Sequence, residues 1–198
     1  MLYSFFRFLI IIILKIFFHF EVRGVKHIPR KGGFILVSNH VSYLDPGVLG
    51  AACSRKLNYM AKEELFCRPW ISRLLHAVYA FPVKRDSADL SAIKEAMRRV
   101  KNGKGLALFP EGSRRFDGKS SEPYAGIGFL SAKLDVPVIP AFISGTEKAL
   151  PRGVKFLKAA SISVRFGEQI PIERRVPYQE TAKQIMDNIR HLSCEESN

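Results

Sequence analysis

Short β-branched runs alternate with amphipathic stretches along most of this chain, and this alternation constrains the fold more than any other feature. We expect strands over residues 34–39, 57–61, 80–84, 105–110, 136–144 and 161–167. Helices are expected over residues 46–53, 68–78, 87–101, 126–134 and 178–192. Strands that alternate with helices form largely parallel sheets, because a parallel pair needs a crossover between its strands. The sequence therefore predicts an α/β fold, a single domain with a mostly parallel mixed sheet flanked by helices.

Size and composition exclude several other classes of protein. A chain of 198 residues suits one domain and can bury a substantial core. With 47% hydrophobic residues, 14 Gly and 11 Pro, it is neither disordered nor collagen-like. Cys53, Cys67 and Cys194 form no CxxC pair and no Cys/His cluster with zinc-ligand spacing. We therefore expect reduced thiols and no metal site, and we exclude a secreted disulfide scaffold.

The charge balance points to an anionic partner. Lys and Arg number 31 against 18 Asp and Glu, a net charge of +13. Such a charge suits nucleic acid, phosphorylated metabolites or an acidic membrane surface. Nucleic acid is disfavoured, because the sequence has no zinc finger, no RNP-type aromatic motif and no basic heptad region.

The first twenty residues, MLYSFFRFLIIIILKIFFHF, are the most hydrophobic segment. As a helix they would be about 30 Å long, close to the thickness of a bilayer core. Arg7 and Lys15 interrupt them, however, and the uninterrupted run from Phe8 to Leu14 is too short to cross alone. We expect a membrane-associated helix over residues 1–20 that lies in the interface or re-enters it, in preference to a full span. A buried core helix is the alternative.

The segment NHVSYLD, residues 39–45, follows the predicted strand over 34–39 directly. Loops at the carboxyl ends of strands in open α/β sheets are where ligands usually bind. Asp45 could fold back onto His40, fix its tautomer and leave the other ring nitrogen free to take a proton from a hydroxyl. In the simpler alternative, Asp45 only caps the following helix and His40 is an ordinary loop histidine.

Two further strand ends carry polar residues suited to a phosphate. FPEGSRR, residues 109–115, combines a glycine, a carboxylate and two guanidiniums, and KRD follows at residues 84–86. Arg offers bidentate donors, Gly allows close backbone approach, and Glu can hold an Arg rotamer. An Arg-rich turn alone is more often a solvated surface. Polar residues of complementary chemistry at three strand ends, counting residues 39–45, favour a ligand site more than any one of them does.

Together these segments resemble the glycerolipid acyltransferase superfamily, in particular its 1-acyl-sn-glycerol-3-phosphate acyltransferase (PlsC-type) branch. NHVSYLD resembles the NHxSxxD box and FPEGSRR the FPEGTRS box. FPVKRD (81–86) resembles the intermediate Arg-bearing block, and VPVIPAFISGT (136–146) resembles the fourth block. The blocks occur in the family's order over about three-fifths of the chain. Ser113 replaces a common Thr and Arg115 a common Ser, which leaves the acceptor headgroup open.

The resemblance implies acyl transfer from acyl-CoA or acyl carrier protein to the sn-2 hydroxyl of lysophosphatidic acid, giving phosphatidic acid in phospholipid synthesis. By similarity, His40 deprotonates the hydroxyl, Asp45 orients His40, and the oxygen attacks the thioester without an acyl-enzyme. The family positions that bind the acceptor phosphate are matched by Arg85, Glu111, Gly112, Ser113 and Arg114.

The same resemblance implies an acyltransferase domain over residues 21–198, with membrane lipids as partners. It implies no cofactor, since acyl-CoA or acyl carrier protein is a co-substrate. The expected location is the cytoplasmic face of the inner or plasma membrane. An acyl groove could be lined by Leu65, Phe66, Trp70 and Leu74, although a core helix is the commoner interpretation. Two alternative functions stay open: acylation of another lysolipid (lysophospholipid remodelling or an amino-acid lipid), and non-catalytic membrane binding.

Overall fold

The protein is represented by a computed structural model that describes residues 2–84, 89–111, 122–151, 153–154 and 156–194. Its strands form one seven-stranded sheet in the order β1-β7-β6-β2-β5-β3-β4. The strands are β1 (His19–Arg23), β2 (Phe34–Ser38), β3 (Leu57–Lys62), β4 (Ala80–Val83), β5 (Gly105–Leu108), β6 (Val138–Ser144) and β7 (Ser161–Phe166). Neighbouring strands are parallel except β6 and β7, which are antiparallel. The predicted mostly parallel mixed sheet is confirmed.

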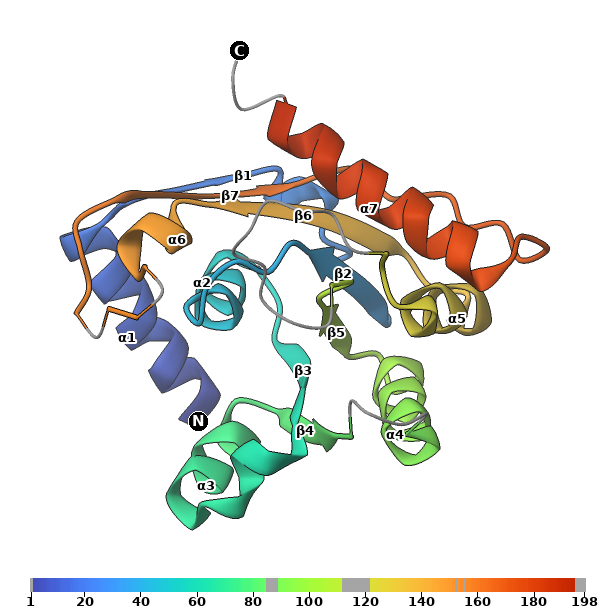
Figure 1. The fold of residues 1–198 in the computed structure, drawn as a ribbon, viewed down its shortest axis with the longest axis horizontal. Helices are drawn as coiled ribbons and strands as arrows, with labels where there is room; N and C mark the ends of the chain where they lie inside the picture. The colour runs from blue at the N-terminus through green and yellow to red at the C-terminus, as the bar shows by residue number, and fades with distance from the viewer. Residues whose placement is uncertain (1, 85–88, 112–121, 152, 155, 195–198) are drawn as a thin grey trace.

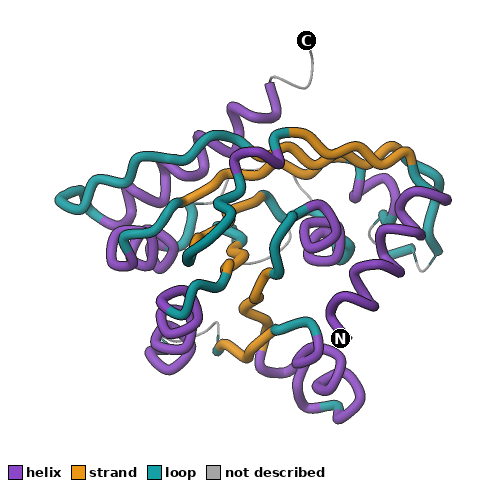
Figure 2. The backbone as a smooth tube through the Cα atoms, turned by 180° about the vertical axis from the view of Figure 1, so that it is seen from behind, coloured by secondary structure: helices purple, strands orange, loops and turns teal. Residues whose placement is uncertain are grey.

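Helices cover both faces of this sheet (Figure 1). They are α1 (Leu2–Phe17), α2 (Asp45–Ala52), α3 (Pro69–Ala77), α4 (Leu90–Lys101), α5 (Ala125–Leu134), α6 (Thr146–Ala149) and α7 (Tyr178–Cys194). Two short 3-10 helices, η1 (Val25–His27) and η2 (Glu63–Cys67), join other elements. The view from behind in Figure 2 shows the same layered arrangement of helices around the strands.

The central strand β2 shows why the core has two halves. Phe34 and Leu36 pack in one apolar cluster with residues of α1 and α2. Ile35 and Val37 pack in the other, with residues of α4, α5 and α7. Because both faces are covered, every residue of β2 is buried, which is typical of a parallel strand between helical layers.

Helix α1 is docked on the domain rather than separate from it. Its residues Tyr3 and Leu14 are buried, and the Arg7 guanidinium donates hydrogen bonds to the carbonyls of Gly50 (3.1 Å) and Cys53 (2.9 Å). These carbonyls belong to the end of α2, where the last turn of a helix has no partners of its own. A basic side chain at this place also complements the helix dipole.

The other side of α1 is apolar and exposed; its exposed large side chains are Leu2, Phe5, Phe8, Leu9, Ile16 and Phe17. Within the described ranges, no helix combines the length and hydrophobicity needed to cross a bilayer. The division of the chain into a membrane-associated helix over residues 1–20 and a domain over 21–198 stays a prediction.

Two local predictions were wrong. The helix predicted over residues 1–20 ends at Phe17. His19 and Phe20 instead begin the edge strand β1 (His19–Arg23), whose backbone pairs in parallel with β7. The cap of α4 is Asp89, whose Oδ1 accepts a hydrogen bond from the Ala92 amide at 3.0 Å. Ser87, the predicted cap, lies outside the described residues.

Candidate active site

The predicted site residues follow strands that end at one edge of the sheet. Strand β5 is parallel to both β2 and β3, and β3 is parallel to β4. The carboxyl ends of these four strands therefore point the same way, and the loops that carry His40, Glu111 and Lys84 leave from the same edge. This is the edge at which open α/β sheets bind ligands.

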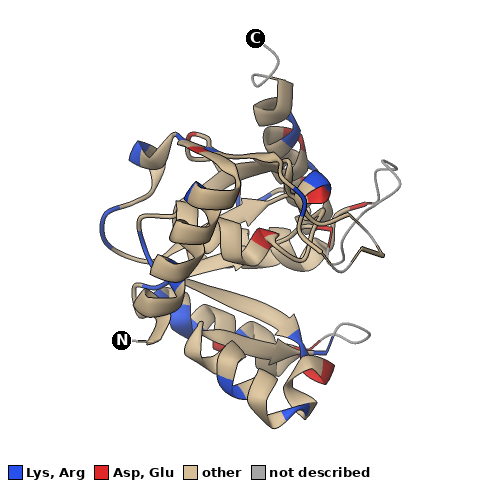
Figure 3. Cartoon of the chain, turned by 90° about the vertical axis from the view of Figure 1, so that its left-hand side faces the viewer, with Lys and Arg blue, Asp and Glu red and all other residues tan. Residues whose placement is uncertain are grey.

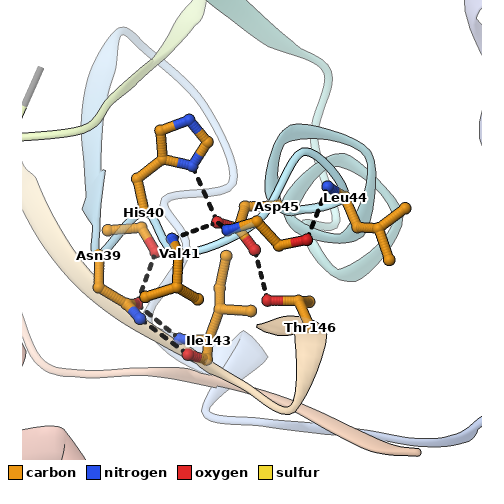
Figure 4. Close-up of polar contacts among 9 residues, drawn as sticks. Asn39, His40, Val41, Leu44, Asp45, Ile143 and Thr146 are labelled. Atoms are coloured by element: carbon orange, nitrogen blue, oxygen red, sulfur yellow. Dashed lines mark hydrogen bonds and ion pairs between the residues drawn. The ribbon is translucent and has the colours of Figure 1, made fainter. Parts of the chain in front are cut away.

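The structure brings His40 and Asp45 together (Figure 4). His40 Nδ1 lies 2.8 Å from Asp45 Oδ2, with the imidazole nearly buried and the carboxylate fully buried. Asp45 does not cap α2: it is the first residue of the helix, the cap position is Leu44, and no side chain caps it. The alternative in which Asp45 serves only as a helix cap is therefore wrong.

The Asp45 carboxylate is held from several directions. Its Oδ2 accepts hydrogen bonds from the backbone amides of Val41 and Ser42, both at 2.7 Å. Its Oδ1 accepts a hydrogen bond from the Thr146 hydroxyl at 2.6 Å. An ionised carboxylate only accepts hydrogen bonds, so His40 donates to it from Nδ1. In this tautomer Nε2 carries the lone pair that a general base needs.

Asn39 fixes the backbone just before His40. Its Nδ2 donates to the Ile143 carbonyl and its Oδ1 accepts from the Ile143 amide, each at 2.8 Å. These bonds continue the pairing of β2 with β6 beyond Ser38 and Ala141. The roles of Asn39 and Thr146 were missed from the sequence, although both residues belong to the blocks that carry the family resemblance.

Phe109 forms a second contact with the imidazole. It stacks on His40 with ring centroids 4.2 Å apart. Phe109 opens the FPEGSRR segment, so this contact joins the first two predicted motifs. Of the predicted phosphate-binding residues only Glu111 is described, half-buried after β5; Arg85, Gly112, Ser113 and Arg114 lie outside the described residues.

An apolar cavity of about 640 Å³ opens beside His40. Residues of α1, α2, β3, η2 and α3 line it, including Phe6, Ile10, Gly47, Ala51, Met60, Leu65 and Leu74. A cavity of this size and character is typical of a ligand site. Burial raises the pKa of Tyr59 well above its ordinary value and also raises that of Tyr3. These two lining hydroxyls are therefore neutral.

Two of the four residues predicted to line an acyl groove lie on the wall of this cavity, and its use for an acyl chain stays a prediction. Leu65 and Leu74 line the cavity, whereas Trp70 is 66% exposed and Phe66 packs against the core. No residue of α3 is fully buried, although Leu75 of this helix packs against the core.

Charged residues are distributed around the sheet. Figure 3 shows Lys and Arg spread over helices and loops. In the part of the chain that the structure describes, no group of three or more His, Cys, Asp or Glu side chains could hold a metal ion. Lys62 lines the cavity and pairs with Glu64 at 3.8 Å.

Comparison with known proteins gives consistent matches. A family model described as Acyltransferase matches residues 19–144. The 1-acyl-sn-glycerol-3-phosphate acyltransferase of Bacillus subtilis is 27% identical over 151 residues, which cover 76% of this chain and 73% of that protein. The human 1-acyl-sn-glycerol-3-phosphate acyltransferase alpha is 26% identical over 86% of this chain and 61% of its own length.

The fold also matches a solved structure. The crystal structure of the 1-acyl-sn-glycerophosphate acyltransferase PlsC from Thermotoga maritima superposes with a TM-score of 0.82 and 24% sequence identity. The match covers 100% of this chain and 79% of that one. Some plant relatives are much longer, and the chain covers 52% of the chloroplastic protein BAT2 of Brassica napus.

Proposed function

The chain belongs to the Acyltransferase family, and on that premise we propose that it transfers a fatty acyl group to the sn-2 hydroxyl of lysophosphatidic acid. The product is phosphatidic acid, an intermediate of phospholipid synthesis. The observation that carries this proposal is the buried His40–Asp45 pair, 2.8 Å apart, at the wall of an apolar cavity. The names of the relatives, 1-acyl-sn-glycerol-3-phosphate acyltransferases, support this acceptor.

The reaction needs a base, an acyl donor and no nucleophile from the protein. His40 Nε2 takes the proton from the acceptor hydroxyl as that oxygen attacks the thioester carbonyl carbon. The tetrahedral adduct then collapses, the carbon–sulfur bond breaks, and the thiolate leaves with the proton that His40 returns. Asp45 stabilises the imidazolium formed in between. A positioned general base of this kind contributes about 10²- to 10⁴-fold to the rate.

The apolar cavity is the proposed site for a fatty acyl chain. Its wall is built mainly from aliphatic and aromatic side chains of α1, β3 and α3, and His40 lies on the same wall. A chain bound there would place its carbonyl end near the imidazole. Transfer of acyl carbons from water into this wall is favourable by about 0.8 kcal/mol per buried methylene.

The acceptor phosphate is proposed to bind at the ends of β4 and β5. The residues are those of the family blocks: Arg85, Glu111, Gly112, Ser113 and Arg114. Support comes from the sheet, because β5 is parallel to β2 and pairs with it directly. A phosphate at the end of β5 would therefore lie next to the hydroxyl that His40 activates.

We also propose that α1 holds the protein at the membrane surface. Its exposed apolar side includes Phe5 and Phe8, each 62% exposed, and Trp70 of α3 is 66% exposed. Exposed aromatic side chains and a net charge of +13 suit an anionic bilayer surface. The cytoplasmic face is proposed because the acyl donors, acyl-CoA or acyl carrier protein, are soluble co-substrates.

The test measures phosphatidic acid formed by the purified protein on phosphatidylglycerol vesicles that contain lysophosphatidic acid. Acyl-CoA and acyl carrier protein thioesters are supplied in separate reactions. His40→Ala is compared with His191→Ala, a histidine of α7 on the opposite side of the sheet. We expect His191→Ala to match the wild type and His40→Ala to lose about 10²-fold or more.

Two outcomes would overturn the proposal. Equal rates for wild type and His40→Ala would show that His40 is not the general base. Faster acylation of lysophosphatidylcholine or of a lyso amino-acid lipid than of lysophosphatidic acid would show that another lysolipid is the acceptor.

A further inference from the structure

Thr146 makes a buried contact with the site from a distant part of the chain. Its hydroxyl donates to Asp45 Oδ1 at 2.6 Å across 101 residues of sequence. Both residues are 0% exposed, so water does not substitute for this hydrogen bond. A polar contact shielded in this way is also stronger than one in water.

The local backbone is shaped to bring Thr146 to this position. Strand β6 ends at Ser144, and the chain then turns at Gly145, whose φ is +82°. A Cβ on Gly145 would lie 1.8 Å from the Ser161 carbonyl oxygen. Glycine is therefore required here for both its conformation and its size. The turn places Thr146 at the start of α6, facing the first turn of α2.

The two oxygens of Asp45 have different partners. Oδ2 accepts from His40, Val41 and Ser42, all within the same loop. These contacts fix one oxygen but leave the carboxylate group free to pivot about it. Oδ1 accepts from Thr146, which follows the end of the neighbouring strand β6. Its hydrogen bond stops that pivot and sets the plane of the carboxylate.

We propose that Thr146 is a positioning residue for acyl transfer, which acts through Asp45 to hold the His40 imidazole in its reactive orientation. This proposal rests on the proposed function for its kinetic consequences. Thr146 is not among the residues that line the apolar cavity. Its loss should therefore reduce the rate of the chemical step and leave substrate binding nearly unchanged.

The kinetic test compares Thr146→Val, which removes the hydroxyl and keeps the shape, with Thr146→Ser, which keeps the hydroxyl. We expect Thr146→Val to lower kcat by about 10- to 100-fold, the cost typical of removing hydrogen bonds that orient metal-site ligands. KM for lysophosphatidic acid should change by less than about twofold. Thr146→Ser should restore kcat to within a few-fold of the wild type.

Thr181→Val is the matched control. Thr181 of α7 is also buried, at 1% exposed, and its hydroxyl donates to the carbonyl of Pro177, the residue before α7, away from the dyad. If Thr181→Val lowers kcat as much as Thr146→Val does, or if Thr146→Ser is no better than Thr146→Val, the positioning role is wrong. A raised KM with unchanged kcat would also overturn it.

A second measurement separates this inference from the proposed function. In protein with ¹⁵N-labelled histidine, the Nδ1–H proton of His40 is assigned by its loss in His40→Ala. We expect this signal to shift and to exchange faster with water in Thr146→Val, and to persist in Thr146→Ser and Thr181→Val. An unchanged signal in Thr146→Val overturns the inference. If the wild type acylates no lysolipid, the proposed function fails, and the NMR comparison still decides the role of Thr146.

Discussion

Phe109 lies flat against the His40 imidazole, with 24° between the ring planes and 4.2 Å between the ring centroids. The two residues are far apart in the sequence and come together because β2 and β5 are adjacent parallel strands. The Phe109 ring limits rotation of the imidazole on one side, while Asp45 holds its Nδ1. The base is therefore oriented by a hydrogen bond and by an apolar surface at once.

Replacement of Phe109 by Ala tests this contact. We expect Phe109→Ala to lower kcat, because the imidazole can then rotate away from the acceptor hydroxyl, and to reduce the free energy of unfolding by about 1–3 kcal/mol, below the cost at a fully buried Phe. The control is Phe156→Ala, since Phe156 is 80% exposed and should change neither quantity. Steady-state kinetics and urea unfolding measure both. Equal kcat values in the two variants would show that stacking on His40 has no catalytic role.

Replacement of Asp45 by Asn tests the charge of the dyad at nearly constant shape. An Asn side chain has one oxygen and one NH₂ group, so the NH₂ group must face either the amides of Val41 and Ser42 or the hydroxyl of Thr146, which are donors themselves. Asn also carries no negative charge to stabilise an imidazolium. We expect kcat to fall by about 10³- to 10⁴-fold, as in serine proteases that lose the equivalent charge. The rate of phosphatidic acid formation is the measurement, with circular dichroism to confirm folding. Near-normal activity in Asp45→Asn would contradict the assigned role of Asp45.

The sequence was sufficient for the parts of the fold that depend on local pattern. Apolar β-branched runs such as residues 34–38 are buried on both faces, and their alternation with helices implies parallel pairing. It was insufficient for β1, although Phe20 and Val22 alternate with polar residues, because the first two residues of β1 continue the hydrophobic stretch from which a helix was predicted. The strand pairs with β7. Edge pairing of this kind depends on a segment more than a hundred residues away.

In the candidate site, too, contacts between residues close in sequence were predictable and contacts between distant segments were not. His40 and Asp45 are close in sequence, so one turn can join them, and the prediction of their contact is confirmed. Thr146 contacts Asp45 only because the carboxyl ends of β2 and β6 lie side by side. No spacing rule within the chain predicts that contact. The phosphate-binding residues Arg85 and Arg114 stay predictions.

Helix α1 supplies a further test, because Arg7 joins it to the end of α2 through the carbonyls of Gly50, Ala51 and Cys53. Arg7→Met keeps much of the aliphatic stem and removes these donors. We expect the free energy of unfolding to fall by about 1–3 kcal/mol, since these hydrogen bonds have a charged donor but are only partly buried. Lys15→Met is the control on the same helix, because Lys15 is exposed. If both variants unfold at the same denaturant concentration as the wild type, Arg7 does not anchor α1.

Stability at acid pH should depend on Glu95. Hydrogen bonds from Arg98 and then Arg99 lower the pKa of Glu95 from 4.5 to about 2. A carboxyl whose pKa is lower in the folded chain stabilises it above pH 4.5, and this contribution disappears as pH falls towards 2. Glu95→Gln should therefore unfold more easily than the wild type at pH 6, and the two should converge near pH 2. Urea unfolding across this range is the measurement, with exposed Glu168→Gln as control. A constant difference between wild type and Glu95→Gln from pH 6 to pH 2 would contradict the prediction.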